Sequence, residues 1–86
     1  MHEMSIALEV CRIAEATAGP GAADRVVTVA VDVGEDAGVE ISSLAFCLET
    51  LLAQPPFTGA RPVLNRLSGD ALRVAYLEVD DGRPND

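Results

Sequence analysis

The first three residues of the chain, Met1, His2 and Glu3, carry the donor groups best suited to chemistry. The α-amine of Met1 has a pKa of about 8, so it loses its proton at modest cost. This amine, the amide nitrogen of His2 and the His2 imidazole can close adjacent chelate rings on one metal ion. Nitrogens arranged in a plane suit square-planar Ni(II) or Cu(II). Glu3 would add an oxygen or a further backbone nitrogen.

The pH should control such a site, because the metal must displace a proton from an amide and affinity therefore rises with pH. The large side chain of His2 should also hinder removal of Met1, which keeps the amine and the imidazole adjacent. A second interpretation stays open from these residues alone. His2 is the only histidine of the chain, and it could be an incidental exposed residue on a terminus.

Catalytic residue sets are missing from the sequence. There is no Ser/His/Asp combination, no glycine-rich phosphate loop and no Cys/His nucleophile pair. General acid–base catalysis has few candidates when the single histidine stands at residue 2. The paired acids at 35–36 and 80–81 are interpreted as solvated loop residues. The sequence therefore predicts a protein that is not an enzyme.

The two cysteines, Cys11 and Cys47, lie far apart and form no CxxC pair. Each falls within or beside an apolar helical stripe, which predicts buried, inert thiols. Two isolated thiols cannot supply the four ligands of a structural zinc site. A disulfide between the two helices is geometrically possible but is disfavoured in a reducing compartment.

Charge and hydropathy exclude several classes of partner. Fourteen acidic residues against six arginines and no lysine give a formal net charge of −8. This charge serves solubility or attracts cations or a basic partner, and it would repel nucleic acid and an anionic membrane surface. No apolar run approaches the ~20 residues that span a bilayer. The N-terminus lacks the pattern of an export signal, which favours the cytoplasm.

Helical periodicity appears twice in the sequence. Residues 6–18 form an amphipathic pattern behind Ser5, a plausible N-cap, and residues 41–53 form a second one with Glu40 or Ser42 near its start. The apolar positions are Ile6, Leu8, Val10, Ile13 and Ala14 in the first, and Ile41, Leu44, Ala45, Leu48, Leu51 and Leu52 in the second. Both patterns predict helices that pack on one side only.

Three segments alternate as strands do: residues 25–33, 60–67 and 71–79. The first is rich in β-branched residues, and its alternation places Val27, Val29 and Val31 on one face. Residues 68–70, Ser-Gly-Asp, favour a hairpin turn, so the last two strands are expected to pair antiparallel.

These elements predict an α+β fold in which two helices pack on one face of a three-stranded mixed sheet, in the order α-β-α-β-β. The chain has 86 residues, enough for one small domain, and only three aromatic residues. Because a domain of this size has a thin stability margin, a homodimer through an exposed strand edge is also possible.

Four segments in this order resemble the HypA/HybF family of hydrogenase-maturation nickel chaperones. They are MHEMS at the start, VDVGEDAGVE at the end of the first strand and the loop behind it, SLAFCLE in the second helix and SGDALRVAYLEVD at the last strand. Order and spacing match from residue 1 to about residue 50 and again from residue 68 to 80. Members of this family normally carry a zinc domain, built on two CxxC pairs, between the last two strands. This sequence has no CxxC, so no zinc is expected.

The resemblance implies a Ni(II) site with Met1 (through its amine) and His2 as ligands. It implies that Glu3 is a ligand or tunes the site, and it places an acid, Glu40, near the nickel. Residues 1–80 would be a HypA-like nickel-binding domain without the zinc module, and residues 81–86 a polar C-terminal tail.

The implied function is that of an accessory protein that assists Ni(II) insertion during [NiFe]-hydrogenase maturation. Its implied partners are a nickel-handling maturation GTPase and the hydrogenase large subunit. The alternative is an interaction or regulatory module of a maturation complex that keeps the fold but does not deliver nickel.

Overall fold

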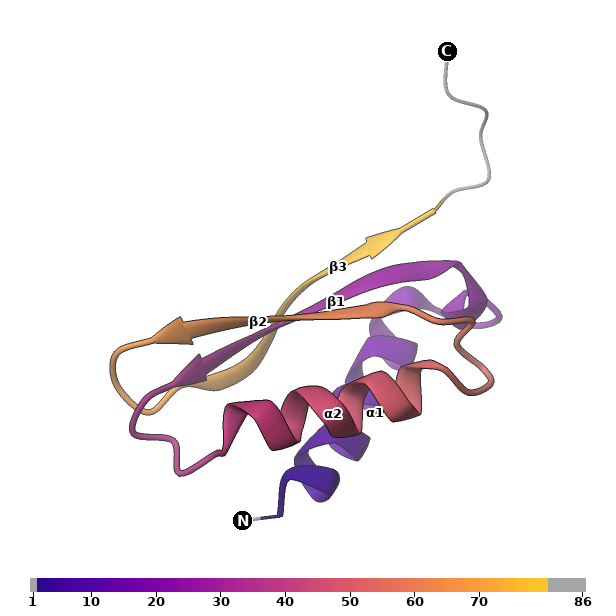
Figure 1. Cartoon of the computed structure of the whole chain (residues 1–86). Coiled ribbons are helices and arrows are strands. Elements are labelled where there is room, and N and C mark those ends of the chain that lie inside the picture. The colour runs from indigo at the N-terminus through magenta and orange to yellow at the C-terminus, as the bar shows by residue number, and fades with distance from the viewer. Residues whose placement is uncertain (1, 81–86) are drawn as a thin grey trace.

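The computed structural model describes residues 2–80 (Figure 1). Its elements are helix α1 (Glu3–Ala18), the short 3-10 helix η1 (Ala23–Arg25), strand β1 (Val26–Gly34), helix α2 (Ile41–Leu52), strand β2 (Arg61–Leu67) and strand β3 (Leu72–Val79). The predicted element order and the mixed three-stranded sheet are confirmed. Neither helix in this part of the chain is both long and apolar enough to cross a membrane.

The sheet order is β2-β1-β3, with β1 parallel to β2 and antiparallel to β3. The expectation that the last two strands pair with each other was wrong, because β1 lies between them (Figure 1). Most of β1 is fully buried, whereas β2 and β3 are largely half-buried or exposed. A continuous apolar strand is best buried in the centre of a sheet. Helix α2 supplies the long crossover that the parallel pair β1–β2 requires.

The short connection from β2 to β3 passes over the carboxyl end of β1. Strands two positions apart lie roughly 10 Å from each other, so this connection must bridge the end of the central strand. The backbone N–H groups of Gly34, Glu35 and Asp36 donate to the carbonyls of Ala71, Leu67 and Gly69, at 2.6, 2.8 and 2.8 Å. Gly69 of the predicted turn and the flanking residues Leu67 and Ala71 therefore fix the end of β1.

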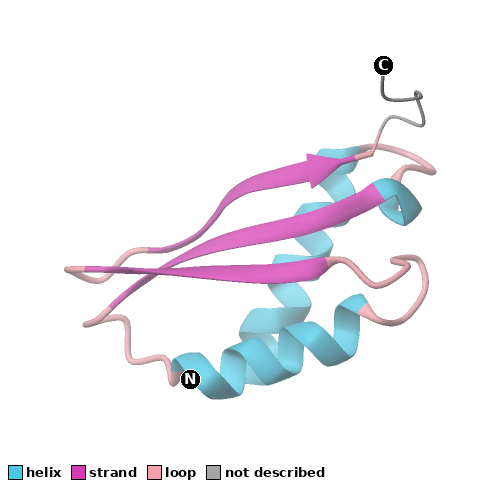
Figure 2. Cartoon of the chain, turned by 45° about the horizontal axis from the view of Figure 1, so that its top comes forward, coloured by secondary structure: helices cyan, strands magenta, loops and turns pink. Residues whose placement is uncertain are grey.

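Both helices cover the same face of the sheet, α1 beside β3 and α2 beside β2 (Figure 2). The core between helices and sheet is almost entirely aliphatic, with Phe57 as its only aromatic member among the described residues. It comprises Ile6, Ala7, Val10, Ala14, Ala23, Val26, Val29, Val31, Val33, Leu44, Leu48, Leu52, Phe57 and Ala60.

Two side chains that were expected to face this core, Val27 and Leu8, do not face it. The pairing of β1 with β3 shifts between Val26 and Thr28, and Val26 is buried whereas Val27 is 48% exposed. The strict alternation predicted for residues 25–33 was therefore wrong at the start of the strand, where Val27 does not share the buried face of Val29 and Val31. On α1, Leu8 was expected in the apolar stripe but is exposed.

The sheet face opposite the helices carries a polar cluster across all three strands. The Asp32 carboxylate on β1 accepts hydrogen bonds from Asn65 Nδ2 on β2, at 3.2 Å, and from Arg73 Nε on β3, at 3.0 Å. Asp32 is only 13% exposed, while the Arg73 side chain is 66% exposed. Cross-strand contacts of this kind stabilise the pairing of the strands.

Candidate metal centre

Helix α1 begins at Glu3, with His2 as its N-cap residue. The N-cap predicted at Ser5 was therefore three residues late. The His2 carbonyl accepts hydrogen bonds from the backbone N–H groups of Ser5 and Ile6, at 3.1 and 3.3 Å. The His2 side chain makes no capping hydrogen bond, and the residue is exposed. His2 is thus fixed through its backbone while its imidazole faces solvent.

The first N–H groups of a helix have no partner within the helix. Because α1 begins at Glu3, the amides of His2 and Glu3 are not needed for its hydrogen-bond ladder. A metal could therefore take an amide nitrogen here without breaking a helical hydrogen bond. The local fold is compatible with the chelate predicted from the sequence.

Glu3 and Glu40, which are 37 residues apart in the chain, meet in the structure. Glu3 Oε2 accepts a hydrogen bond from the Glu40 backbone N–H at 3.2 Å. Glu40 is the N-cap of α2, so this contact joins the starts of the two helices. Both helix starts carry positive partial charge, which the two carboxylates offset. The result is an acidic corner, formed by Glu3 and Glu40, directly after His2.

Glu40 has a structural role of its own. Its side chain accepts hydrogen bonds from the N–H of Ser42, at 2.9 Å, and from the Ser42 hydroxyl. These bonds lower the pKa of Glu40. The hydrogen bond from the Ser42 hydroxyl has the largest effect, the backbone N–H groups of Ser42 and Ser43 follow, and the charge of Arg66 lowers the pKa less. The sequence placed Glu40 or Ser42 near the start of α2, and the structure shows that they form the cap together.

The lowered pKa makes the α2 cap sensitive to acid. The cap stabilises the folded state at pH values above the ordinary glutamate pKa, about 4.3, and is lost as the pH falls through the lowered folded value. The stability difference between the parent and Glu40→Ala should therefore be present at pH 7 and shrink below pH ~4. Urea unfolding at a series of pH values measures it.

Glu40→Gln is the matched control for this experiment. Glutamine keeps an oxygen that can accept from the Ser42 N–H but cannot titrate. The difference between Glu40→Gln and Glu40→Ala should stay nearly constant over the same pH range. An equally constant difference for the parent would contradict the capping role of the carboxylate.

Arg66 is a neighbour of this corner that the sequence did not indicate. It lines a polar hollow of about 240 Å³ together with Gly34, Glu35, Val39, Glu40 and Ile41. Arg66 comes from β2, beside the end of β1, and its register partner is Val33. The parallel β1–β2 pairing, which sequence reasoning missed, is what brings this positive charge close to Glu40.

Three of the four predicted metal residues lie close together, and the fourth is not among the described residues. His2, Glu3 and Glu40 gather at one end of the helical layer, while Met1 lies outside the described residues. Within residues 2–80 no group of three or more His, Cys, Asp or Glu side chains is arranged to hold a metal. The side chains of this part of the chain therefore do not form a site by themselves, and the predicted chelate depends on backbone nitrogens.

The cysteines are free and lie apart from this corner, on the two helices. Both are half-buried rather than fully buried, and both pack against the core. Burial raises the pKa of the Cys11 thiol, which disfavours the thiolate that would bind a metal. The prediction of buried thiols was therefore wrong in its burial, and the inertness of the two thiols stays a prediction.

Comparison with known proteins gives a consistent result. Residues 1–72 match the family model described as "Hydrogenase/urease nickel incorporation, metallochaperone, hypA". The hydrogenase maturation factors HypA of Azoarcus sp. (strain BH72) and of Geobacter metallireducens are each 38% identical over 69 residues, covering 80% of this chain. HypA of Albidiferax ferrireducens is 33% identical over 79 residues, covering 92% of this chain and 70% of that relative.

The chain spans 60% of the length of the first two relatives. The family model covers α1, β1, α2 and β2, and it includes all four predicted metal residues. Its description and the names of the relatives are those of a metallochaperone and of maturation factors, which agrees with the prediction that the chain is not an enzyme. The chain belongs to the HypA family of hydrogenase and urease nickel-incorporation metallochaperones.

Proposed function

We propose that this chain binds one Ni(II) ion at its N-terminus and passes it on during the maturation of a [NiFe]-hydrogenase. The observation that carries the proposal is the position of His2. It is the N-cap of α1, held by its carbonyl, with an exposed imidazole and an amide that the helix does not need. In a member of a nickel-incorporation family, this arrangement suits a cargo site that a recipient can reach.

The proposed ligands are the Met1 amine, the His2 amide nitrogen and the His2 imidazole. Glu3 completes the coordination through its carboxylate or its backbone nitrogen, which also lies in the unpaired first turn. Planar nitrogen coordination favours Ni(II) and Cu(II) over metals that prefer oxygen. Transfer would proceed by ligand exchange, with no covalent chemistry in the protein.

Glu40 is proposed to act beside the nickel and not chiefly as a ligand. Its carboxylate is occupied by the α2 cap, and its backbone N–H holds the Glu3 carboxylate. Glu40 would therefore fix the direction of Glu3 and contribute negative charge near the cation. The positive ends of two helices would otherwise oppose the binding of a cation at this corner.

The partners proposed from the family resemblance are a nickel-handling maturation GTPase and the hydrogenase large subunit, in the cytoplasm. The proposal includes no zinc, no nucleic acid and no membrane. Residues 1–80 would form the nickel-binding domain, and residues 81–86 lie outside the described residues.

A nickel titration of the chain with Met1 as its first residue tests this proposal. We expect one Ni(II) per chain by isothermal titration calorimetry, an affinity that rises with pH and a square-planar d–d band in visible absorption. The loaded chain should then release its nickel to a stronger chelator. Binding of a hydrogenase maturation protein without nickel binding would instead support the interaction-module alternative.

A further inference from the structure

We propose that the outer edge of β3 is a homodimer interface, in which two copies of this chain pair their β3 strands antiparallel. In this register, Val74 of one copy lies opposite Leu77 of the other, and Leu72 lies opposite Val79. The two sheets would join into one continuous sheet. The inference concerns a different surface from the proposed nickel site and does not depend on it.

The residues that this register pairs, 72, 74, 77 and 79, are those whose backbone N–H and C=O groups point away from β1. At one end of the strand, Gly34 N–H donates to the Ala71 carbonyl, so residue 71 faces β1. By the alternation of an antiparallel ladder, Leu72 and Val74 then face away from β1. At the other end, Asp80 N–H donates to the Arg25 carbonyl, so Val79 and Leu77 face away in the same manner.

Ala75 makes this arrangement self-complementary. The partner of β1 changes from Tyr76 at Ala30 to Val74 at Val31, so Ala75 is an extra residue in β3. A bulge of this kind moves the following residues to the other side of the pleat. Val74 and Leu77 therefore share the helix-covered face although they are three residues apart. Residues paired across an antiparallel ladder must share a face, and this register satisfies that condition.

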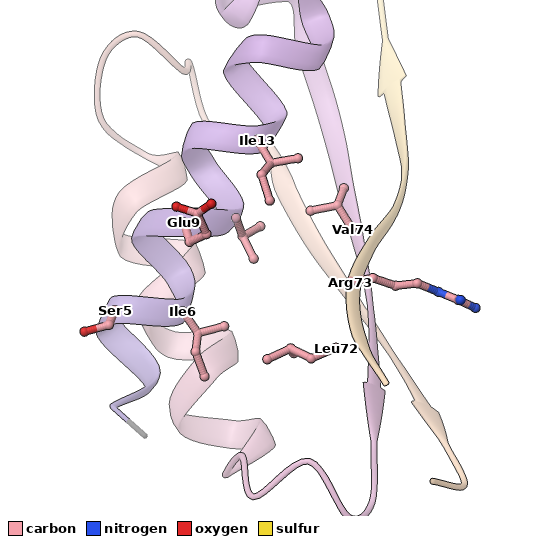
Figure 3. Close-up of a pocket in the computed structure, with 8 residues that line it drawn as sticks. Ser5, Ile6, Glu9, Ile13, Leu72, Arg73 and Val74 are labelled. Atoms are coloured by element: carbon pink, nitrogen blue, oxygen red, sulfur yellow. The ribbon is translucent and has the colours of Figure 1, made fainter. Parts of the chain in front are cut away.

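An apolar groove lies beside the same edge on the helix-covered face. It has a volume of about 250 Å³ and is lined by Ser5, Ile6, Glu9, Val10, Ile13, Leu72, Arg73 and Val74. Leu72 and Val74 point from β3 toward Ile6 and Ile13 of α1 (Figure 3). In the dimer, Leu77 and Val79 of the second copy would extend this apolar row. Val79 is 45% exposed in the single chain, although it belongs to the sheet.

Charge complementarity selects the same register on the other face. Arg73 points away from the groove, to the sheet face without helices (Figure 3), where its Nε donates to Asp32. Glu78 pairs with Thr28 of β1, across the bulge from Arg73. The register that places Val74 opposite Leu77 also places Arg73 opposite Glu78 of the second copy. Opposite charges facing each other across strands stabilise such a pair, and like charges destabilise it.

The other sheet edge is less suited to strand pairing. It is formed by β2, whose second residue is Pro62. Proline has no N–H to donate and discourages pairing at an edge. Within residues 2–80, β3 therefore offers the one sheet edge without a proline. A single usable edge gives a closed two-fold dimer and no fibre.

The experiment is sedimentation velocity of the 86-residue chain over a concentration series reaching about 1 mM, where weak dimers assemble. The parent should show a reversible monomer–dimer equilibrium. Arg73→Glu and Glu78→Arg should each weaken self-association about tenfold, because each places like charges opposite each other twice in the dimer. An equimolar mixture of the two variants should restore dimers. One variant then has glutamate at both positions 73 and 78 and the other has arginine at both, so opposite charges face each other at both contacts.

Rescue in the mixture separates pairing from misfolding, because neither variant changes when they are combined. Val79→Pro is a further variant, which removes an outward N–H without removing a bond to β1 and should also reduce dimerisation. A parent that stays monomeric would overturn the proposal. A dimer that is insensitive to these substitutions would place the interface elsewhere, and failure of the mixture to restore it would overturn the register.

Discussion

His2→Ala is expected to lower the affinity of the chain for Ni(II) by two orders of magnitude or more. Replacing groups that only support a metal ligand already costs about 10–100-fold in affinity, so the loss of an imidazole ligand should exceed that range. The amine and the backbone nitrogens would remain, but the chelate ring through the imidazole would be lost. Calorimetric titration of both chains with Ni(II), at one and the same pH, would measure the difference.

The structure predicts that this substitution leaves the fold intact. The capping contacts of His2 come from its carbonyl, and its side chain forms no capping bond. Thermal unfolding of the nickel-free variant should therefore match that of the parent. Unchanged nickel affinity in a folded variant would eliminate the N-terminal site.

Blocking the amine provides the matched second measurement. A chain with one extra residue before Met1 keeps the imidazole of His2 but converts the amine into an amide. If the amine is a ligand, this chain should also bind nickel weakly and lose the square-planar absorption band. A loss confined to His2→Ala would point to imidazole and carboxylate ligands alone, with Glu3 as the next residue to replace.

Gly34→Ala is expected to destabilise the fold by about 3 kcal/mol or more, at the upper end of what overpacking costs. A Cβ on Gly34 would contact the Gly69 carbonyl oxygen and approach the Ala71 nitrogen to 2.7 Å. Both are backbone atoms of the connection that crosses the end of β1, so no side chain can move aside. Because the same connection accepts hydrogen bonds from the N–H groups of Gly34, Glu35 and Asp36, its displacement would also break these backbone hydrogen bonds.

Gly38→Ala is the control for this substitution. Gly38 has a φ of +74°, which an alanine adopts only with strain, but a Cβ there meets no atom within 4 Å. This substitution should destabilise the fold by about 1 kcal/mol. Urea unfolding of both variants measures the contrast. Equal losses would mean that the crossing connection yields easily and does not clamp β1.

The sequence predicted the elements but not their neighbours. Periodicity identifies both helices and the two outer strands, because each buries one side against a shared core. The run of β-branched residues identifies β1, which is buried on both faces. Strand order depends on competition for the central position, and local pattern does not report it. The short Ser-Gly-Asp segment at 68–70 resembles a hairpin turn, yet it bridges β1. The signal that favours the observed order is the apolar character of β1, whose residues 29–31 are fully buried.

The candidate site divides in a similar way. The grouping of Met1, His2 and Glu3 is local, so the sequence alone suggests it. The contact between Glu3 and the Glu40 backbone depends on two helices that start at the same end of the domain. The position of Arg66 depends on the parallel β1–β2 pair. The spacing of residues in the sequence predicts neither of these two contacts.

The start of α1 at Glu3 would couple nickel binding at the proposed N-terminal site to local unfolding. The residues proposed to hold nickel are also those that begin the helix. The free energy of metal binding would therefore add to the free energy needed to open the first turn. Bound nickel would suppress fraying and slow the exchange of amide hydrogens early in α1. By reciprocity, a recipient that pulls the first turn open would weaken the binding of the ion. Release would then need only the melting of one helical turn, with the rest of the domain left folded.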